Sequence, residues 1–180
     1  MIATFFFKKI NKNNINFKFS DLTQFAEKES YDLILSVDVM EHILEDVKVF
    51  ESFYNALNKG GTVLISTPSN EGGSDVHDHE HESFIEEHVR DGYGVVEIKN
   101  KLESVGFKNI IVKYSYGSLG KISWKISMKY PILLLNISKV FFIFLPLYYL
   151  SLFPICLLFN WLDTMMNHKT GTGLIVKASK

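Results

Sequence analysis

The sequence contains little cysteine and no excess of charge of either sign. Its single cysteine, Cys156, lies inside an apolar run, which excludes a disulfide framework and a thiolate metal site. Nineteen lysine and arginine residues nearly balance 20 aspartate and glutamate residues. The resulting net charge of −1 gives no electrostatic reason to expect nucleic acid as a partner. The cysteine content is consistent with a reducing compartment.

The start of the chain lacks the pattern of an export signal. In MIATFFFKK the lysines follow a short apolar run, whereas a signal peptide carries its basic residues first and has a longer apolar stretch. We therefore do not expect export. The length of 180 residues is sufficient for one domain with a core of its own.

Residues 31–68 are the most informative part of the sequence. The run 33–37 is short and apolar, as expected for a strand that is covered on both faces. Apolar residues then recur at helical spacing over 45–58, and Gly60 and Gly61 predict the end of that helix. Residues 62–66 form a second apolar run. The order strand, helix, strand predicts a crossover within a parallel sheet.

Four further elements are expected outside this unit. Alternation of apolar and polar residues over 15–19 predicts a short strand that ends in a polar turn. Apolar spacing over 95–105, followed by Gly106, predicts a helix. Residues 107–116 and 174–178 are rich in residues that favour strands.

Four segments, in their order and spacing, carry a resemblance to a known family. They are YDLILSVDVMEHI, NKGGTVLISTPS, the helix ending ESVGF and the closing GTGLIVKA. Together they resemble the class I S-adenosylmethionine-dependent methyltransferases, particularly members that act on small or lipophilic acceptors. The resemblance implies an α/β fold with a Rossmann-like sheet and S-adenosyl-L-methionine as cofactor.

The resemblance also implies where the cofactor binds. Asp21 and Leu22 correspond to the turn that meets the adenine ring, while Val37 and Asp38 border the methionine end. Each assignment has a structural alternative. Asp21 is also an ordinary helix N-cap or turn residue, and Asp38 and Glu41 are also first-turn acids that complement a helix dipole.

The best-known motif of the family, a glycine-rich turn after its first strand, has no counterpart here. Residues 1–20 contain no glycine. In the family the strand order is 3-2-1-4-5-7-6, and this chain supplies 4-5-7-6 together with a detached third strand. The sequence therefore predicts a sheet that is incomplete at its N-terminal half, a C-terminal portion of a methyltransferase. It also predicts that the strand 33–37 is an uncovered edge and that the chain alone binds cofactor poorly.

Three histidines are the candidates for catalysis. His42 follows the strand on the cofactor side and has an unperturbed pKa suited to a general base, although a structural histidine is the alternative. His77 and His81 lie in a polar loop that leaves the second strand of the 31–68 unit, and they are candidate acceptor contacts or bases beneath a lid. Alternating histidines also occur at metal sites, but a stable site usually takes ligands from more than one element. We expect no metal.

Residues 140–162 form a run without any charged residue, and this run is long enough for a transmembrane helix. Pro146 and Pro154 are expected to divide this run into pieces that are too short to span. A single crossing would also separate the last strand from its sheet. A re-entrant or monotopic hairpin is therefore expected, preceded by an interfacial lysine stripe at 121, 125 and 129. A strand over the lysine segment, a buried helical hairpin and a dimer interface are the alternatives.

These observations predict a methyltransferase, represented by a truncated chain, that transfers a methyl group to a small or lipophilic acceptor. The alternative is a non-catalytic membrane-associated domain derived from a methyltransferase. Residues 1–117 and 170–180 are expected to form the partial methyltransferase domain, and residues 118–169 an apolar, membrane-associated insertion. The expected location is the cytoplasmic side of a membrane, otherwise the cytoplasm, and the expected partners are the acceptor and the membrane surface.

Overall fold

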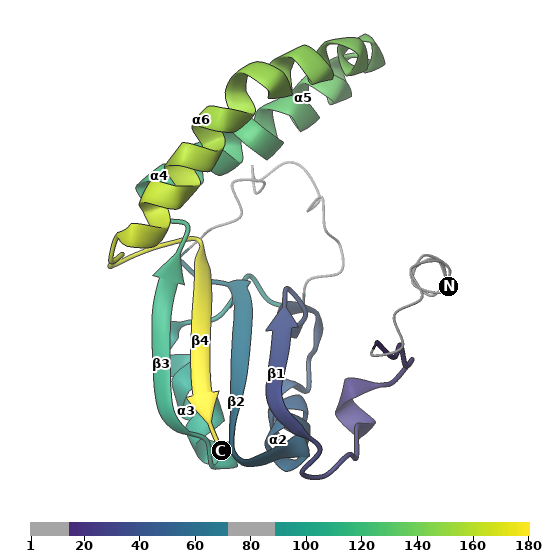
Figure 1. Cartoon of the computed structure of the whole chain (residues 1–180), viewed down its shortest axis with the longest axis vertical. Helices are drawn as coiled ribbons and strands as arrows, with labels where there is room; N and C mark the ends of the chain where they lie inside the picture. The colour runs from purple at the N-terminus through teal and green to yellow at the C-terminus, as the bar shows by residue number, and fades with distance from the viewer. Residues whose placement is uncertain (1–14, 72–88) are drawn as a thin grey trace.

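The structure, a computed structural model, describes residues 15–71 and 89–180. Its centre is a four-stranded mixed sheet in the order β1-β2-β4-β3 (Figure 1). The strands are β1 (Tyr31–Val37), β2 (Leu57–Pro68), β3 (Lys108–Ser115) and β4 (Gly173–Ser179). β1 and β2 are parallel, and β4 is antiparallel to both of its neighbours. This is the strand order 4-5-7-6 expected from the sequence, and the Rossmann-like fold class is confirmed.

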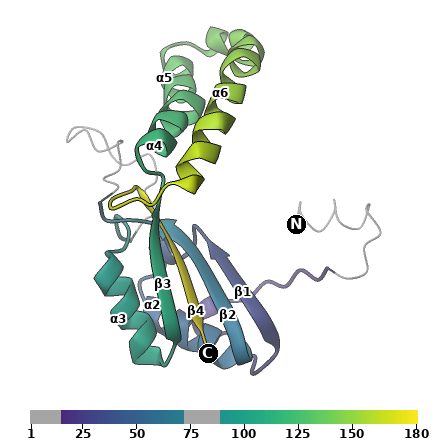
Figure 2. The same cartoon turned by 60° about the vertical axis from the view of Figure 1, so that its left-hand side comes forward.

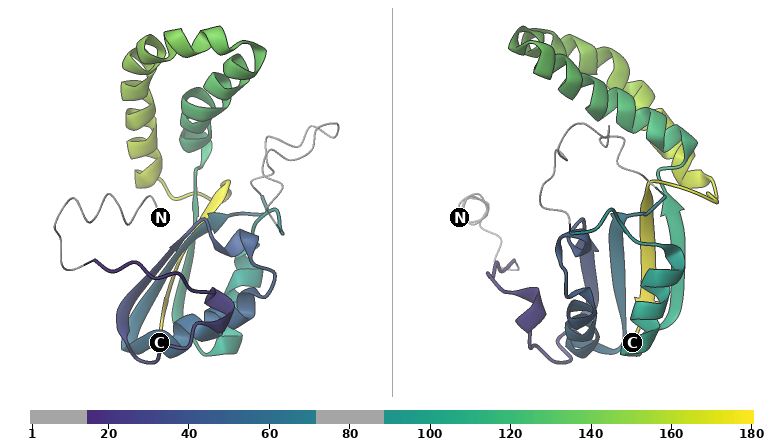
Figure 3. Two further views of the ribbon diagram at one scale, coloured as in Figure 1. Left: turned by 90° about the vertical axis from the view of Figure 1, so that its right-hand side faces the viewer. Right: turned by 180° about the vertical axis from the view of Figure 1, so that it is seen from behind.

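Two helices, α2 (Asp46–Ala56) and α3 (Val95–Val105), lie against one face of this sheet, as Figure 2 and the rear view in Figure 3 show. The main core fills the space between them and the strands. It includes Val49, Phe50 and Phe53 of α2, Ile98 and Leu102 of α3, and Val63, Ile65, Leu174, Val176 and Ala178 of the sheet. α3 ends where expected, because Gly106 adopts the left-handed conformation at φ +112°.

The opposite face of the sheet has no covering helix among the described residues. Leu33, Leu35 and Val37 of β1 point to this face and are 56%, 66% and 50% exposed. β1 is also the edge strand, since β2 is its only partner within the ranges described. The expected uncovered edge is therefore confirmed, but the expectation that residues 33–37 are covered on both faces is wrong for this chain.

Two other local predictions are wrong. Residues 15–19 form no strand and run as irregular backbone into the short helical turn η1 (Leu22–Gln24), because no described strand lies beside them to accept a ladder of hydrogen bonds. The glycines do not end α2 either. The helix ends at Ala56, and Gly60, at φ +79°, lies within β2 where the register against β1 shifts.

A helical hairpin connects β3 to β4. Its first arm is one continuous run of helix, made of α4 (Ser118–Trp124), a π-helical turn η3 (Lys125–Lys129) and α5 (Tyr130–Ile137). After a 3₁₀ segment, η4 (Lys139–Phe144), the second arm is α6 (Leu145–Met165). The expected division at the prolines is wrong, because Pro146 lies in the first turn of α6 and the helix continues through Pro154. The alternative of a strand over the lysine segment is also excluded.

The base of the hairpin is fixed by the carboxylate of Asp163, near the end of α6. Its two oxygens accept hydrogen bonds from the backbone N–H groups of Gly117 and Gly120, at 3.1 and 2.9 Å. Glycine is needed at both positions, since a Cβ on Gly120 would lie 2.7 Å from Asp163 and one on Gly117 would overlap the ring of His168. The His168 Nε2 atom is also 3.3 Å from the carboxylate. The start of the first arm and the end of the second therefore form one junction.

Replacing Asp163 with alanine should loosen this junction. The change leaves two buried amides without an acceptor, which costs about 2–6 kcal/mol in total, whereas Asp163→Asn keeps one acceptor oxygen and should cost less. Hydrogen exchange at the Gly117 and Gly120 amides measures the effect. Thr164→Ala, at an exposed neighbour, is the control. Unchanged exchange in Asp163→Ala would contradict the assignment.

Candidate active site

The turn that follows β1 lies at the edge of the sheet where β1 and β2 both end. Asp38 adopts a left-handed conformation at φ +50°, which aspartate tolerates better than most residues, and its N–H donates to the Ser66 carbonyl of β2 at 2.9 Å. The chain then forms a single helical turn, η2 (Met40–His42). The turn is therefore fixed to the end of the neighbouring strand, where ligands of open α/β sheets bind.

Glu41 and His42 take different positions on this turn. Glu41 is 1% exposed, and its carboxylate accepts a hydrogen bond from the Thr67 hydroxyl of β2 at 3.3 Å. His42 lies at the surface, with its Nε2 atom 3.9 Å from the Glu41 carboxylate. The turn therefore presents an accessible imidazole, the side chain most often used as a general base, next to a buried carboxylate.

A buried polar cluster holds the turn from below. The Tyr93 hydroxyl lies 2.7 Å from the Asp46 carboxylate and 3.2 Å from the Met40 carbonyl, so it contacts both the turn and the start of α2. Arg90 and Lys101 each approach the same Asp46 oxygen at 2.7 Å. Arg90 also donates to the Ile43 carbonyl. The cluster thus connects the turn, α2, α3 and the segment that precedes α3.

The cluster shifts the pKa values of two of its members. Burial alone would raise the pKa of Asp46, but hydrogen bonds from Lys101 and Tyr93 and the charges of Arg90 and Lys101 outweigh it, so the pKa lies below its usual range. Burial, together with the hydrogen bond to Asp46, raises the pKa of Tyr93. Asp46 is therefore a structural carboxylate, and Tyr93 is a permanent hydrogen-bond donor.

The residues predicted to bind the cofactor lie on two sides of β1. Asp21 caps η1, and its carboxylate accepts hydrogen bonds from the Thr23 N–H and hydroxyl at 2.9 and 2.7 Å, which lower its pKa. Leu22 lines a hollow of about 310 Å³ along the outer edge of β1, together with Ser36 and Val39. Val37 points to the open face of the sheet. The cap role of Asp21 is thus present, and the binding roles of all four residues stay predictions.

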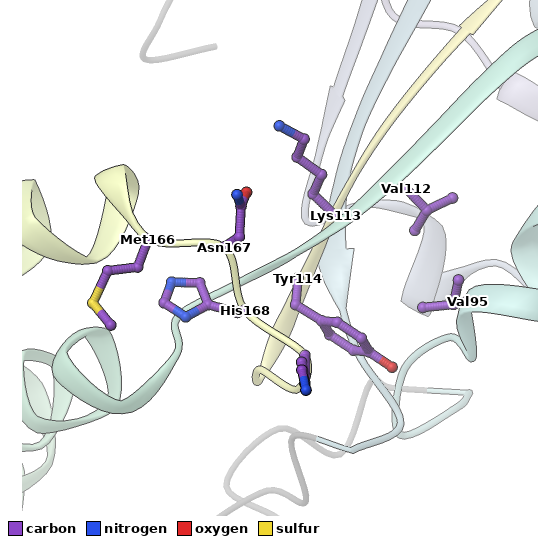
Figure 4. A pocket seen from close by; sticks show the side chains of 8 residues that line it. Val95, Val112, Lys113, Tyr114, Met166, Asn167 and His168 are labelled. Atoms are coloured by element: carbon purple, nitrogen blue, oxygen red, sulfur yellow. The ribbon is translucent and has the colours of Figure 1, made fainter.

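A second hollow, of about 260 Å³, lies elsewhere, at the base of the hairpin (Figure 4). β3 contributes Val112, Lys113 and Tyr114, and the segment after α6 contributes residues 166–169. It is not lined by Asp38 or His42, so we place the candidate site at the turn after β1. The predicted residues His77 and His81 lie outside the described residues. No group of three metal-ligating side chains is present in the parts of the chain that the structure describes.

Sequence reasoning missed the residues that support the turn. Asp46 was not singled out, and Tyr93 and Arg90 lie in a segment with no recognisable motif. Their roles depend on contacts made across more than forty positions of the chain, as between Tyr93 and Asp46. Glu41 was recognised as a charged turn residue, but its burial against β2 could not be read from the sequence.

Comparison with known families identifies the family of this chain. The family model for a methyltransferase domain matches residues 5–112, more than half of the chain. The chain belongs to the class I S-adenosylmethionine-dependent methyltransferase family. A comparison with curated proteins finds no match.

Solved structures of methyltransferases share the fold. A phosphoethanolamine N-methyltransferase from Haemonchus contortus, in complex with S-adenosyl-L-methionine, is 19% identical with a TM-score of 0.53; the match covers 89% of this chain and 36% of that enzyme. An S-adenosylmethionine-dependent methyltransferase from Mesorhizobium loti is 15% identical with a TM-score of 0.54, with coverage of 96% and 74%. This methyltransferase chain therefore spans about a third of the Haemonchus enzyme.

A third relative limits what the fold implies. The [4+2]-cyclase SpnF is 11% identical with a TM-score of 0.58, and the match covers 99% of this chain and 60% of the cyclase. At such identities the likeness concerns the fold alone. The reaction has to be argued from the residues at the site.

The lowered pKa of Asp46 predicts acid sensitivity. The contribution of ionised Asp46 to the free energy of unfolding is present in full above the ordinary aspartate pKa of about 3.9. It is lost as the pH falls below that value toward the lowered pKa of Asp46 in the folded chain. Urea unfolding at pH 7 and at pH 3 measures it. Asp46→Asn should reduce the pH dependence, while Glu51→Gln, an exposed change on the same helix, should retain it. Equal pH dependence in Asp46→Asn and the unmodified chain would contradict the prediction.

Proposed function

We propose that this chain forms the acceptor-side half of a methyltransferase site that uses S-adenosylmethionine and acts on a small or lipophilic acceptor. The observation that carries the proposal is the turn at residues 38–42. It combines an exposed imidazole and a buried carboxylate at the carboxyl ends of two parallel strands, in a chain of the methyltransferase family. The whole activity, like the acceptor, rests on this proposal because the chain spans only part of its longer relatives.

The residues present fit part of the donor. Asp38 and Val37 are exposed at the end of β1, where the methionine end of the cofactor would be held, and Leu22 lines the hollow beside this strand. Asp21 retains a second carboxylate oxygen beyond the one that accepts from Thr23. When bound, S-adenosylmethionine supplies the methyl group. The chain's own contribution is then to position the acceptor and exclude water.

His42 is the proposed general base for an acceptor hydroxyl. Its ring is accessible at the end of β1, so it can take the acceptor proton, and the Glu41 carboxylate lies 3.9 Å from its Nε2 atom. We assign His77 and His81 as acceptor contacts from the loop after β2. The lipophilic character of the acceptor rests on the apolar hairpin, which leaves the sheet at the same edge as the turn (Figure 1). We place the protein on the cytoplasmic side of a membrane.

Cofactor affinity should be weak in the 180-residue chain. Residues 1–20 contain no glycine-rich turn, and in the described part of the chain no strand pairs with the outer edge of β1 to form a second wall for the donor. Calorimetry with S-adenosylhomocysteine should therefore give no saturable binding below about 1 mM, equivalent to a binding free energy weaker than about −4 kcal/mol. Micromolar affinity would contradict the proposal of a half-site.

The catalytic role of His42 can be tested in a longer methyltransferase that contains this chain. His42→Ala should lower kcat on a hydroxyl acceptor by about 10²–10⁴-fold and remove the acidic limb of the pH–rate profile. Glu45→Gln, at an exposed neighbour, should leave both unchanged. The double variant His77→Ala/His81→Ala should also lower turnover. A pH profile in His42→Ala identical to that of the unmodified protein would reject the base role.

A second candidate function is a non-catalytic, membrane-associated domain that keeps the methyltransferase sheet. The observation that favours it is the open edge and face of β1, since a donor cradle would adjoin this strand. Turnover in any protein that contains this chain would exclude this candidate. Intact membrane binding without turnover or donor binding would favour it.

A further inference from the structure

We infer that the helical hairpin of residues 118–165 is a monotopic membrane element that lies along the surface of an anionic bilayer, with its apolar side chains among the acyl chains and its lysines at the headgroups. The inference concerns a surface distinct from the methyl-transfer site and does not depend on catalysis. It rests on three observations: the exposure of the hairpin, the pairing of its backbone and the sign of its charge.

The hairpin exposes apolar side chains on most of its surface. Within Lys139–Met165, an 18-residue stretch has a mean hydropathy of 2.2 and is only 6% buried, so by length and composition this segment could cross a membrane. The exposed side chains come from the tip and both arms. They include Leu133, Ile137, Phe142, Ile143, Phe144, Leu147, Leu150, Leu157, Leu158 and Trp161. A surface of this kind marks an interaction site.

Two adjacent backbone carbonyls of the first arm, which lack their α-helical partners, accept hydrogen bonds from side chains of α6. In an α-helix the Ser127 carbonyl would accept from the N–H of residue 131, but that residue is proline. The Tyr149 hydroxyl of α6 donates to this carbonyl instead, at 2.9 Å. The lost bond is thus replaced by a side chain of the opposite arm.

The neighbouring carbonyl, that of Ile126, also accepts a hydrogen bond from a tyrosine of α6. The π-helical turn directs the Tyr130 N–H to the Lys125 carbonyl and away from Ile126. The Tyr148 hydroxyl then donates to the Ile126 carbonyl at 2.6 Å. At an aqueous surface, water would satisfy both carbonyls. In hydrocarbon only the protein can do so, which accounts for two adjacent tyrosines aimed at two adjacent carbonyls.

The charge of the hairpin complements anionic headgroups. No acidic residue occurs between Glu103 and Asp163, whereas Lys121, Lys125, Lys129 and Lys139 lie between the base and the tip. A surface that is apolar and purely cationic matches an anionic bilayer.

The distribution of the lysines sets the orientation. They extend from Lys121 near the base, through the first arm, to Lys139 in η4 near the tip, so a perpendicular hairpin would bury several of them in hydrocarbon. A hairpin that lies along the surface lets each stem extend to the headgroups. Because β3 and β4 meet the hairpin at the same edge of the sheet, both ends stay on one side of the bilayer (Figure 3).

The two tryptophans of the chain, Trp124 and Trp161, both lie in the hairpin, so tryptophan fluorescence, excited at wavelengths that tyrosine does not absorb, reports on it alone. Vesicles of phosphatidylcholine with phosphatidylglycerol should bind the full chain and shift its emission to shorter wavelength. Vesicles of pure phosphatidylcholine should bind the chain with an affinity at least about tenfold lower. Absence of a shift and of co-sedimentation with anionic vesicles would overturn the inference.

Two pairs of variants test the residues that carry it. Phe142→Ser/Ile143→Ser should lower vesicle partitioning about tenfold or more, whereas Val96→Ser, at an exposed apolar residue of α3, should not. Tyr148→Phe/Tyr149→Phe keeps the apolar surface and removes only the hydroxyls. It should weaken partitioning while the free chain keeps its circular dichroism spectrum. Unchanged partitioning in both double variants would reject the proposal.

Orientation and the rival occupant have their own readouts. Two single-tryptophan chains report the depth of the hairpin: one carries Trp124→Phe, Trp161→Phe and Phe142→Trp, and the other carries Trp124→Phe alone and so retains Trp161. Brominated lipids should quench the two tryptophans at the same depth in the bilayer. A much greater depth for the tryptophan at position 142, at the tip, would overturn the surface orientation. A second copy of the chain is the rival occupant. A stable dimer in sedimentation, lost in Phe142→Ser/Ile143→Ser and unaffected by vesicles, would assign the surface to self-association instead.

Discussion

The antiparallel placement of β4 between β2 and β3 is the constraint on which the rest of the structure depends. β3 ends and β4 begins at the same edge of the sheet, where Ser115 pairs with Gly173 and Pro68 pairs with the same residue from the other side. The residues between them must leave and return at one place. An apolar excursion can then only be a hairpin, and Asp163 closes it by capping Gly117 and Gly120. The same edge carries the turn of Asp38, so the apolar hairpin and the candidate site share one end of the molecule.

Much of the sheet could be predicted because its strands carry their own signals. The apolar run of β1, the β2 run ending at Pro68 and the helix closed by Gly106 needed no tertiary information. The failures have a common cause, since each depended on a partner. Residues 15–19 alternate like a strand but have no strand beside them to pair with. Pro154 breaks a hydrogen bond of α6 without ending it, because the opposite arm packs along the helix, as the bond from Ser123 to the Cys156 carbonyl shows. Gly60 lies where the pairing of β2 with β1 shifts its register, a feature that depends on β1 and not on the local sequence.

In the candidate site, too, the residues that the sequence could suggest differ from those that only the fold brings together. Its exposed groups, Asp38 and His42, were predictable from their place after a strand, because parallel strands present their ends at one edge. The supporting groups were not. Asp46, Tyr93 and Lys101 come from three separate segments, and only the fold brings their charges and hydroxyl together. Such clusters determine how rigid a turn is, so sequence reasoning can propose what a site contains more readily than how firmly it is held.

The open edge of β1 has a thermodynamic consequence. Any extended segment that pairs with it would lie beside Ser36, whose buried hydroxyl has no hydrogen-bond partner within residues 15–71 and 89–180, and would enclose the hollow lined by Leu22. A ligand that binds only the paired form would then pull the pairing equilibrium forward, by an amount set by its concentration relative to its dissociation constant. Completion of the sheet and loading of the donor would be linked equilibria, each strengthening the other by the same factor.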